Sequence, residues 1–246
     1  MPKRILLDCR LFTGGADLSG ASNKVEVSAE TEDKDVTNYR SPQGWKEILG
    51  GLSSAVITGE GQWEAGDPGK VDNVSWAELG AVGAWTVCPT DSIVGALAYF
   101  TRALRADYTL GEAVGEVAPW KGTAKSSWPL VRGQIGHPPG TARTASGTGT
   151  GLQIGAVAAG RRLYAALHVL SVAGTGTPTL TVAIESDDAS GFASATTRLT
   201  FDAATAAGGQ ILRTDGTAIT DTWYRANWTI SGTSPSFLFA LALGVA

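Results

Sequence analysis

The chain has 246 residues, enough for one large β domain or two ordinary modules, and we expect two. Its net charge of -4 and pI near 5.2 exclude binding to nucleic acid through a basic face, because neutralising phosphates requires clustered lysine and arginine. With 43% hydrophobic and only 17% charged residues, the chain has a charge-poor surface, which is typical of a protein that packs against copies of itself.

Cysteine usage and the N-terminus exclude further classes. Cys9 and Cys88 are too few for a disulfide framework and lack metal-ligand spacing, so we expect reduced thiols in or near the core. The apolar run before Asp8 is far shorter than a signal-peptide core, and no stretch approaches the roughly 18 apolar residues of a membrane span. We therefore expect a protein that is made in a cytoplasm and has no membrane partner.

The first half is predicted to consist of strands beside a short helix. The 32 glycines supply the positive φ angles of tight turns, and residues 24–30 alternate apolar and polar with the period of a half-buried strand. Residues 41–51 predict a helix with a serine cap, a proline at its first position, apolar residues such as Trp45 on one face, and two glycines at its end. Residues 52–63 return to strand, and residues 92–98 predict a short helix or turn that leads into strands.

A run rich in Pro, Gly, Thr and Ser at 137–151 predicts a linker or exposed loop between two modules, 1–136 and 152–246. The second module is predicted to contain two hairpins and a short helical turn. Its predicted segments are strands 161–172 and 179–186 joined by loop 173–178, the helical turn 202–209, and strands 223–230 and 237–243 joined by loop 231–236. Strand, short helix and strand in each half favour a duplication, although no residue-level repeat accompanies it.

The sequence offers few candidates for a chemical site. They are His137 and His168, the acidic groups Glu60, Glu64, Asp67 and Glu185, Asp187, Asp188, and the glycine-rich run 147–151. The histidines lack a partner at usable spacing, the acidic groups lack the spaced ligands of a calcium loop, and the glycine run lacks the lysine of a phosphate-binding loop. We therefore expect no enzymatic activity, no cofactor, no metal and no catalytic residue.

Tryptophan is the other conspicuous residue type. The eight tryptophans could stack on sugars, or they could anchor the core and contacts between subunits. Their scatter over both halves favours the second interpretation. They are Trp45, Trp63, Trp76, Trp85, Trp120, Trp128, Trp223 and Trp228.

Several segments, taken in order, resemble the tail tube proteins (major tail proteins) of long-tailed bacteriophages. They are Leu6–Asp8, Asp17–Gly20, Val25–Glu30, Asp35–Thr37, the Trp45 segment, Gly50–Leu52, Gly59–Trp63 and Ala113–Val117, with a looser match at Trp223–Arg225 and Ser231–Phe237. The resemblance covers the first half well. It implies a β-sandwich or partial barrel with a short flanking helix, plus a second β-rich module that is either a duplicate or an outer decoration.

The resemblance also implies partners and a place in the virion. Strands would join across copies of this chain into stacked rings of six chains, or of three if both halves are tube modules, assembled in the host cytoplasm. The tail terminator, tape measure and baseplate proteins would be further partners. DNA would pass through an acidic lumen without specific binding, because attraction at many phosphates would arrest it. The alternative is a carbohydrate-binding, host-recognition or decoration β-sandwich of the virion.

Overall fold

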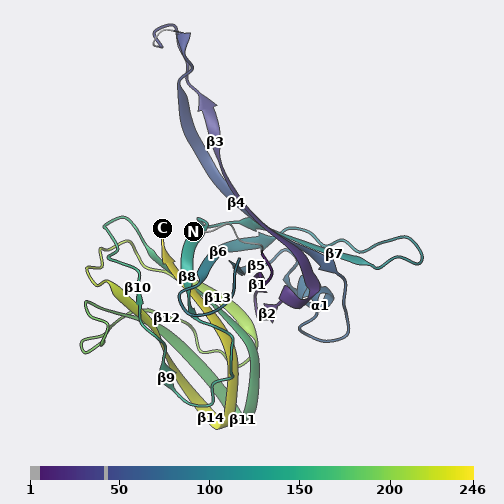
Figure 1. Ribbon diagram of the computed structural model, residues 1–246, viewed down its shortest axis with the longest axis vertical. Helices are drawn as coiled ribbons and strands as arrows, with labels where there is room; N and C mark the ends of the chain where they lie inside the picture. Colours follow the sequence, from purple (N-terminus) through teal and green to yellow (C-terminus); the bar gives the residue numbers. More distant parts are fainter. Residues whose placement is uncertain (1–5, 42–43) are drawn as a thin grey trace.

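The computed structural model describes residues 6–41 and 44–246, and in this part of the chain antiparallel strands dominate beside one short α-helix (Figure 1). The predicted mainly β fold class, with a sandwich or partial barrel and a short helix, is confirmed. The first-half elements are β1 (Arg10–Thr13), β2 (Ala16–Asp17), a 3-10 turn (Ser19–Ala21), β3 (Ser22–Asp35), β4 (Ile48–Gln62), α1 (Val71–Glu78), β5 (Val82–Cys88), β6 (Leu97–Arg105), β7 (Pro119–Ser126) and β8 (Val131–His137). The second half adds β9 (Gly147–Thr148), β10 (Leu152–Gln153), β11 (Leu163–Asp187), β12 (Thr196–Thr200), β13 (Gly208–Arg213) and β14 (Trp223–Val245).

The main sheet curls so that its two ends face each other. Its strand order is β12-β11-β14-β8-β6-β5-β1-β2, yet Phe12 of β1 and Tyr164 of β11 belong to the same buried cluster. Phe100 of β6 and Ala242 of β14 fill the space between them. These four side chains come from four different strands and meet on one face of the curled sheet. The result is a partial barrel with an apolar interior.

The two longest strands form a ribbon that folds back on itself. β11 and β14 pair from Leu163↔Val245 to Asp187↔Trp223, and Figure 1 shows the ribbon reversing at the bottom of the view. Positive φ angles at Gly174, Gly176 and Gly232 produce the reversal. The halves of the ribbon then face each other across one large hydrophobic cluster, which makes the second module a β-sandwich.

The predicted hairpins of the second module have the wrong strand partners. Residues 163–172 pair with 237–245, and residues 179–187 pair with 223–231, so neither predicted loop joins two paired strands. The predicted loops 173–178 and 231–236 instead lie side by side at the reversal of the ribbon. Local turn residues signal a change of direction, but the pairing partner depends on contacts that are distant in sequence.

Helix α1 covers the outer face of the first half. Val71 and Val74, at helical spacing, are buried against Leu11 of β1 and Trp120 of β7. Asp72 lies in the first turn, where a negative charge is favourable, and Gly80 with φ of 76° follows the helix end. This is the short flanking helix of the predicted fold, but it begins 30 residues after the predicted start at residue 41.

The helix predicted at 41–51 is wrong for residues 45–51, because 45–47 have no regular secondary structure and 48–51 are strand. Residues 48–51 are the first residues of β4, and Pro42 and Gln43 lie outside the described residues. The Trp45 side chain is 75% exposed rather than packed on a sheet. Pairing of Ile48 with Asp35 across the hairpin decides the conformation here, because a ladder of hydrogen bonds outweighs weak local helix propensity.

The remaining local predictions have mixed outcomes. Residues 24–30 and 52–62 are strands, as predicted. Residues 93–95 form a turn before β6, which confirms the turn alternative for 92–98 and not the helix. Residues 202–209 contain a β-bridge at Ala204 instead of a helical turn. The division of the chain at 137–151 stays a prediction; the sheet itself continues across it, since β8 pairs with β14.

Candidate assembly surface

The most prominent feature of the surface is the β3–β4 hairpin, which projects away from the body of the molecule (Figure 1). Its strands pair from Ser22↔Gly61 to Asp35↔Ile48. Near the root, Ile57 is fully buried and Val27 packs against the same cluster. Between Ala55 and the tip of the hairpin, no described residue of either strand is buried. Most of the length of the hairpin therefore has no packing support within the chain.

Both margins of the projecting hairpin carry unpaired backbone. Among the described residues, β3 pairs with β4 alone, and the pairing of β4 with β7 begins only at Val56. The outer edge of β3 and the edge of residues 48–54 on β4 therefore present free N–H and C=O groups, whereas the Ala55 N–H donates to the Ser126 hydroxyl at 2.8 Å. Such edges are templates for pairing with another chain, and natural proteins usually protect them. Two open edges on one hairpin allow the same contact to repeat from copy to copy.

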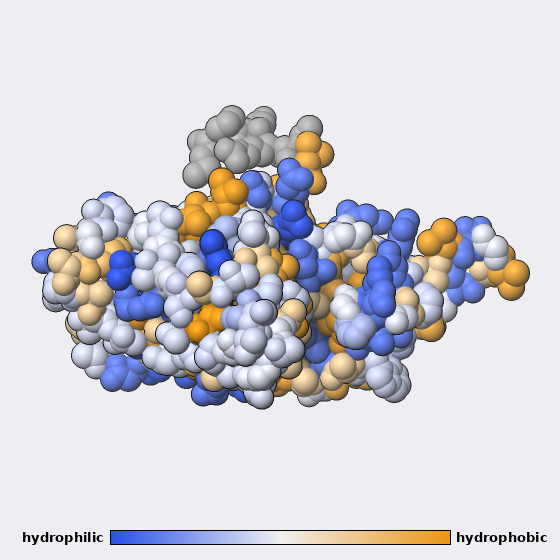
Figure 2. Space-filling view, turned by 90° about the horizontal axis from the view of Figure 1, so that it is seen from below, coloured by the Kyte–Doolittle hydropathy of each residue, from blue (hydrophilic) through white to orange (hydrophobic). Residues whose placement is uncertain are grey.

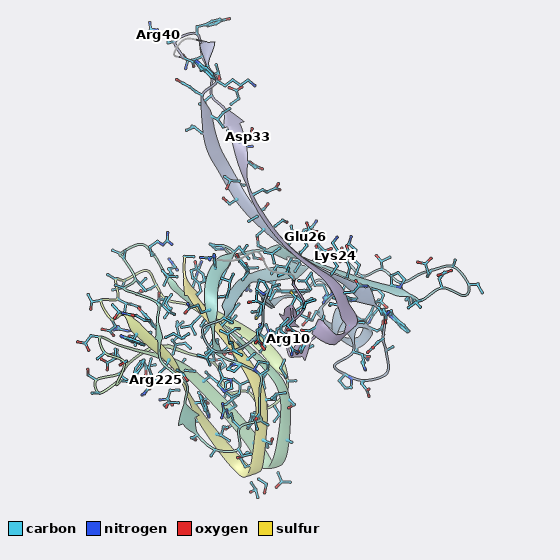
Figure 3. All side chains as sticks on the ribbon, viewed as in Figure 1. Arg10, Lys24, Glu26, Asp33, Arg40 and Arg225 are labelled. Atoms are coloured by element: carbon cyan, nitrogen blue, oxygen red, sulfur yellow. The ribbon has the colours of Figure 1, made fainter. Side chains whose placement is uncertain are left out.

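The side chains of the hairpin are charged on the face opposite the core. Glu26, Glu30 and Glu32 share this face with Lys24 and Lys34, because alternate residues of β3 point the same way. Figure 3 shows Lys24 and Glu26 near the root and Asp33 and Arg40 towards the tip. Lys24 bridges Glu26 and Glu60 at 3.5 Å each, and these ion pairs are exposed. A hydrogen bond from Lys121 lowers the pKa of Glu60 below its ordinary value.

Apolar side chains gather at the far end of the hairpin. Tyr39 is fully exposed, and Trp45, Ile48, Leu49 and Leu52 expose between half and four fifths of their surface. Monomeric proteins seldom expose a contiguous set of large apolar side chains, and such sets mark contact sites. The end of the hairpin is therefore a second candidate for contact with another chain, in addition to its free edges.

A second projection, the 106–118 loop between β6 and β7, extends on the other side of the hairpin root (Figure 1). Figure 2 shows apolar residues gathered on this projection. Leu110, Val114 and Val117 are more than half exposed, and Val114 is fully exposed. The base of the loop is fixed, because the Tyr108 hydroxyl donates a hydrogen bond to Asp72 of α1 and the Asp107 carboxylate accepts one from the Thr123 N–H at 2.8 Å.

The two histidines are buried groups with complete hydrogen bonds. His168 Nδ1 donates to the Gly14 carbonyl at 2.9 Å, and its Nε2 accepts from the Thr86 hydroxyl at 2.8 Å. His137 Nδ1 donates to the Phe239 carbonyl at 3.1 Å, and its Nε2 accepts from Arg143 at 3.1 Å. Burial lowers the pKa of each imidazole to about 4. Both rings hold strands together in the neutral form.

The acidic candidates have local partners. Glu64 forms an ion pair with Lys70 at 2.6 Å, and Asp187 accepts hydrogen bonds from the Ala189 and Ser194 N–H groups, which closes a turn. Glu185, near the end of β11, is 9% exposed and pairs with Arg225 at 2.9 Å. Within residues 6–41 and 44–246, no group of three or more His, Cys, Asp or Glu side chains is arranged to hold a metal ion.

The cysteines and tryptophans divide between core and surface. Cys88 is buried, which raises the pKa of its thiol to about 12, and Cys9 is partly buried; both are free. Trp85, Trp120 and Trp228 are buried in the core, whereas Trp45 and Trp76 are more than two thirds exposed. Trp63, Trp128 and Trp223 lie between these extremes. In the part of the chain that is described, no helix is long and apolar enough to cross a membrane.

Two parts of this surface were not identified from the sequence. Ile48 and Leu49 were assigned to a helix, although two glycines and a β-rich run follow them directly. The sequence predicts strands after residue 98 and does not mark 106–118 as a projecting loop, although Gly111 and Gly115 interrupt its apolar residues. In both cases the signal was the placement of glycine among apolar residues, which argues for exposed connections rather than core elements.

No family model matches the sequence, and no curated protein matches it. Among solved structures, the chain is similar to a chain of the virion of a native gene transfer agent particle, with 20% identity over 53% of this chain and 98% of that one and a TM-score of 0.43. It is also similar to a chain of the tail of an empty gene transfer agent particle with C6 symmetry, with 20% identity over 54% and 98% and a TM-score of 0.42. A third similar structure is the SPP1 Dit protein, at 10% identity over 97% of this chain and 99% of that one, with a TM-score of 0.32.

Proposed function

We propose that the chain is a structural, non-enzymatic subunit of a phage tail that assembles with copies of itself into stacked rings, a tube for DNA. The observation that carries this proposal is the projecting hairpin, which has two open edges and buries no described side chain between Ala55 and its tip. A two-stranded hairpin alone in water is marginally stable at best. Its 14-residue strand β3, roughly 46 Å long at about 3.3 Å per residue, therefore requires a partner.

The two open edges are complementary. Part of the outer edge of β3 in one copy can pair with residues 48–54 of β4 in the next copy, which continues the antiparallel order of the hairpin. This contact joins two different surfaces, so it repeats head to tail and closes when the rotation between copies divides a full turn. Closure pairs the free edge of β4 in every copy with an equal length of the 14-residue strand β3, which reduces the liability that open edges present.

The charge of β3 suits a wall that faces DNA. β3 holds five acidic residues and two lysines, and the face that points away from the core carries three of the acidic residues together with both lysines, a net charge of about -1. Negative charge repels phosphate and lets DNA pass without being held. Replacing Glu30 and Glu32 by lysine is expected to leave ring formation intact and to slow DNA passage in an infection assay. Unchanged passage would contradict the assignment of this face to the lumen.

The direct test of the proposal is a shortened hairpin. Replacing residues 31–53 by Asn-Gly joins Glu30 to Ser54, the last retained pair, through a two-residue turn. Because the deleted segment buries no described side chain, the thermal transition of the monomer is expected to stay within a few degrees of the wild type. Rings and tubes, imaged by electron microscopy at rising protein concentration, are expected to disappear.

Tube formation by the shortened chain is the result that would contradict the proposal. If the shortened chain still forms tubes, the hairpin edges do not carry assembly. Six copies in each wild-type ring would leave the second module as an outer decoration, whereas three copies would favour two tube modules in one chain. Specific sugar binding by a monomer that never polymerises, measured on a glycan array, would favour the carbohydrate-binding alternative.

A further inference from the structure

We propose that a basic aromatic patch formed by Arg102, Trp128 and Arg213 binds the 106–118 loop of a second copy of this chain. The inference rests on the proposed function, because it assigns one lateral contact between neighbouring subunits. Two observations carry it. One is a pair of arginines that flank a single ring without a carboxylate partner, and the other is an acidic, apolar loop that its own copy leaves uncovered.

The patch concentrates positive charge at one place on the molecule. The Cζ atoms of Arg102 and Arg213 lie 5.6 Å and 4.3 Å from the centre of the Trp128 ring, and Tyr164 meets the same ring edge-on at 6.0 Å. In residues 6–41 and 44–246, neither arginine forms an ion pair, whereas Arg105, Arg198 and Arg225 each do. Two like charges beside one ring are stabilised when an anion joins them.

The patch is held in shape before any partner arrives. The Ser127 and Trp128 N–H groups donate to the Arg102 carbonyl at 2.7 and 3.3 Å, and the Thr101 hydroxyl donates to the Trp128 carbonyl at 2.9 Å. Trp128 also lines a groove of ≈ 570 Å³ between the hairpin root and residues 126–130. These bonds fix the backbone that carries Arg102 and Trp128, which lowers the entropic cost of binding.

The 106–118 loop matches this surface in charge and in polarity. It contains Asp107, Glu112 and Glu116 and no basic residue. Fully exposed Val114 and largely exposed Val117 alternate with the two glutamates. A valine of the loop can pack on the indole of Trp128 while the two glutamates pair with the guanidinium groups of Arg102 and Arg213.

The loop is held away from the patch of its own copy: it begins close to Arg102, just after Arg105 of β6, but Tyr108 and Asp107 anchor its base to Asp72 and Thr123. The loop joins β7 at Pro119, and the patch lies just beyond the other end of β7, at Ser127 and Trp128. Eight strand residues separate these ends by roughly 26 Å at about 3.3 Å per residue. Figure 1 shows the loop extending outwards from the end of β7, away from the rest of the sheet. A loop on one side and its receptor on the other define a head-to-tail contact, the kind that closes into rings.

Charge reversal with rescue tests the contact. Arg213→Glu, and separately Glu112→Arg with Glu116→Arg, are each expected to raise the concentration needed for assembly by about tenfold or more. The triple variant carries both reversals in every copy and is expected to return towards the wild-type value. Arg161→Glu, which changes the charge of an exposed arginine outside the patch, is the matched control and is expected to have no effect.

Cross-linking tests the location independently of tube formation. Val114→Cys protein mixed with Ser127→Cys protein, both with Cys9→Ser, is expected to form a disulfide-linked pair under mild oxidation. The same Val114→Cys protein mixed with Ser190→Cys protein, exposed on a distant turn, is expected to form none. Tubes without the cross-link, or tubes insensitive to Arg213→Glu, overturn this contact and leave the proposed function standing. A wild-type chain that stays monomeric, together with no cross-link between the Val114→Cys and Ser127→Cys proteins, overturns both.

Discussion

Lowering the pH from 7 to 5 is expected to destabilise the fold through two buried histidines. His137 and His168 have pKa values of about 4 in the folded chain, below the ordinary value of 6.5, because burial disfavours the charged ring. As the pH falls below 6.5, the unfolded chain binds protons that the folded chain does not. Stability is therefore unaffected above about pH 6.5 and decreases as the pH falls towards 4.

The geometry supports this direction. In each ring Nδ1 donates to a backbone carbonyl, so Nε2 is the acceptor and must gain the proton. At His137 the added proton would face the Arg143 guanidinium, a donor that already carries positive charge. Each histidine contributes about 1.4 kcal/mol per pH unit within the window, which is about 2 kcal/mol at pH 5 and about 4 kcal/mol for the pair.

Urea unfolding of the monomer at pH 7, 6 and 5, followed by tryptophan fluorescence, measures this loss. The variants His137→Gln and His168→Gln keep a donor and an acceptor but do not titrate, so each is expected to remove about half of the pH dependence. Carboxylates whose pKa is lowered, such as Asp221, act below this window. A free energy of unfolding that is equal at pH 7 and 5 would refute the reasoning, as would an unchanged slope in the double variant.

Two further substitutions test the packing. Gly133→Ala places a Cβ 2.3 Å from the Leu243 carbonyl oxygen and is expected to cost about 1–3 kcal/mol in chemical unfolding, whereas Gly140→Ala, with open space around it, should be neutral. Trp120→Phe removes the 2.9 Å hydrogen bond from Nε1 to the buried Ser75 hydroxyl. A double-mutant cycle with Ser75→Ala is expected to give about 1 kcal/mol of coupling, and strictly additive losses would contradict the bond.

Alternation and composition predict correctly those features of the fold that depend on residues close together in the sequence. Alternation over residues 24–30 identified β3, because a strand with one buried face repeats every second residue. Glycine abundance and low charge identified a mainly β chain. The turn residues at 173–178 and 231–236 marked real changes of direction, at which the long ribbon reverses.

Pairing over long distances decided what the pattern left open. The two glycines and one proline at 173–178 are compatible with flanking strands that pair with each other and with flanking strands that pair with β14. Only the burial of both ribbon halves in one core selects the second pairing. The sequence does not indicate which strand edges are free either, because an edge is free only when no other strand pairs with it.

The sequence by itself determined the fold class, the strand character of the first half and the scarcity of chemical groups suited to catalysis. Only the tertiary structure decided that residues 48–51 belong to a projecting hairpin and that Arg102, Trp128 and Arg213 meet at one place. The physical reason is the range of the interactions. Periodicity records which face of an element is buried, while edges and patches arise from segments that are far apart in the chain and are brought together by packing.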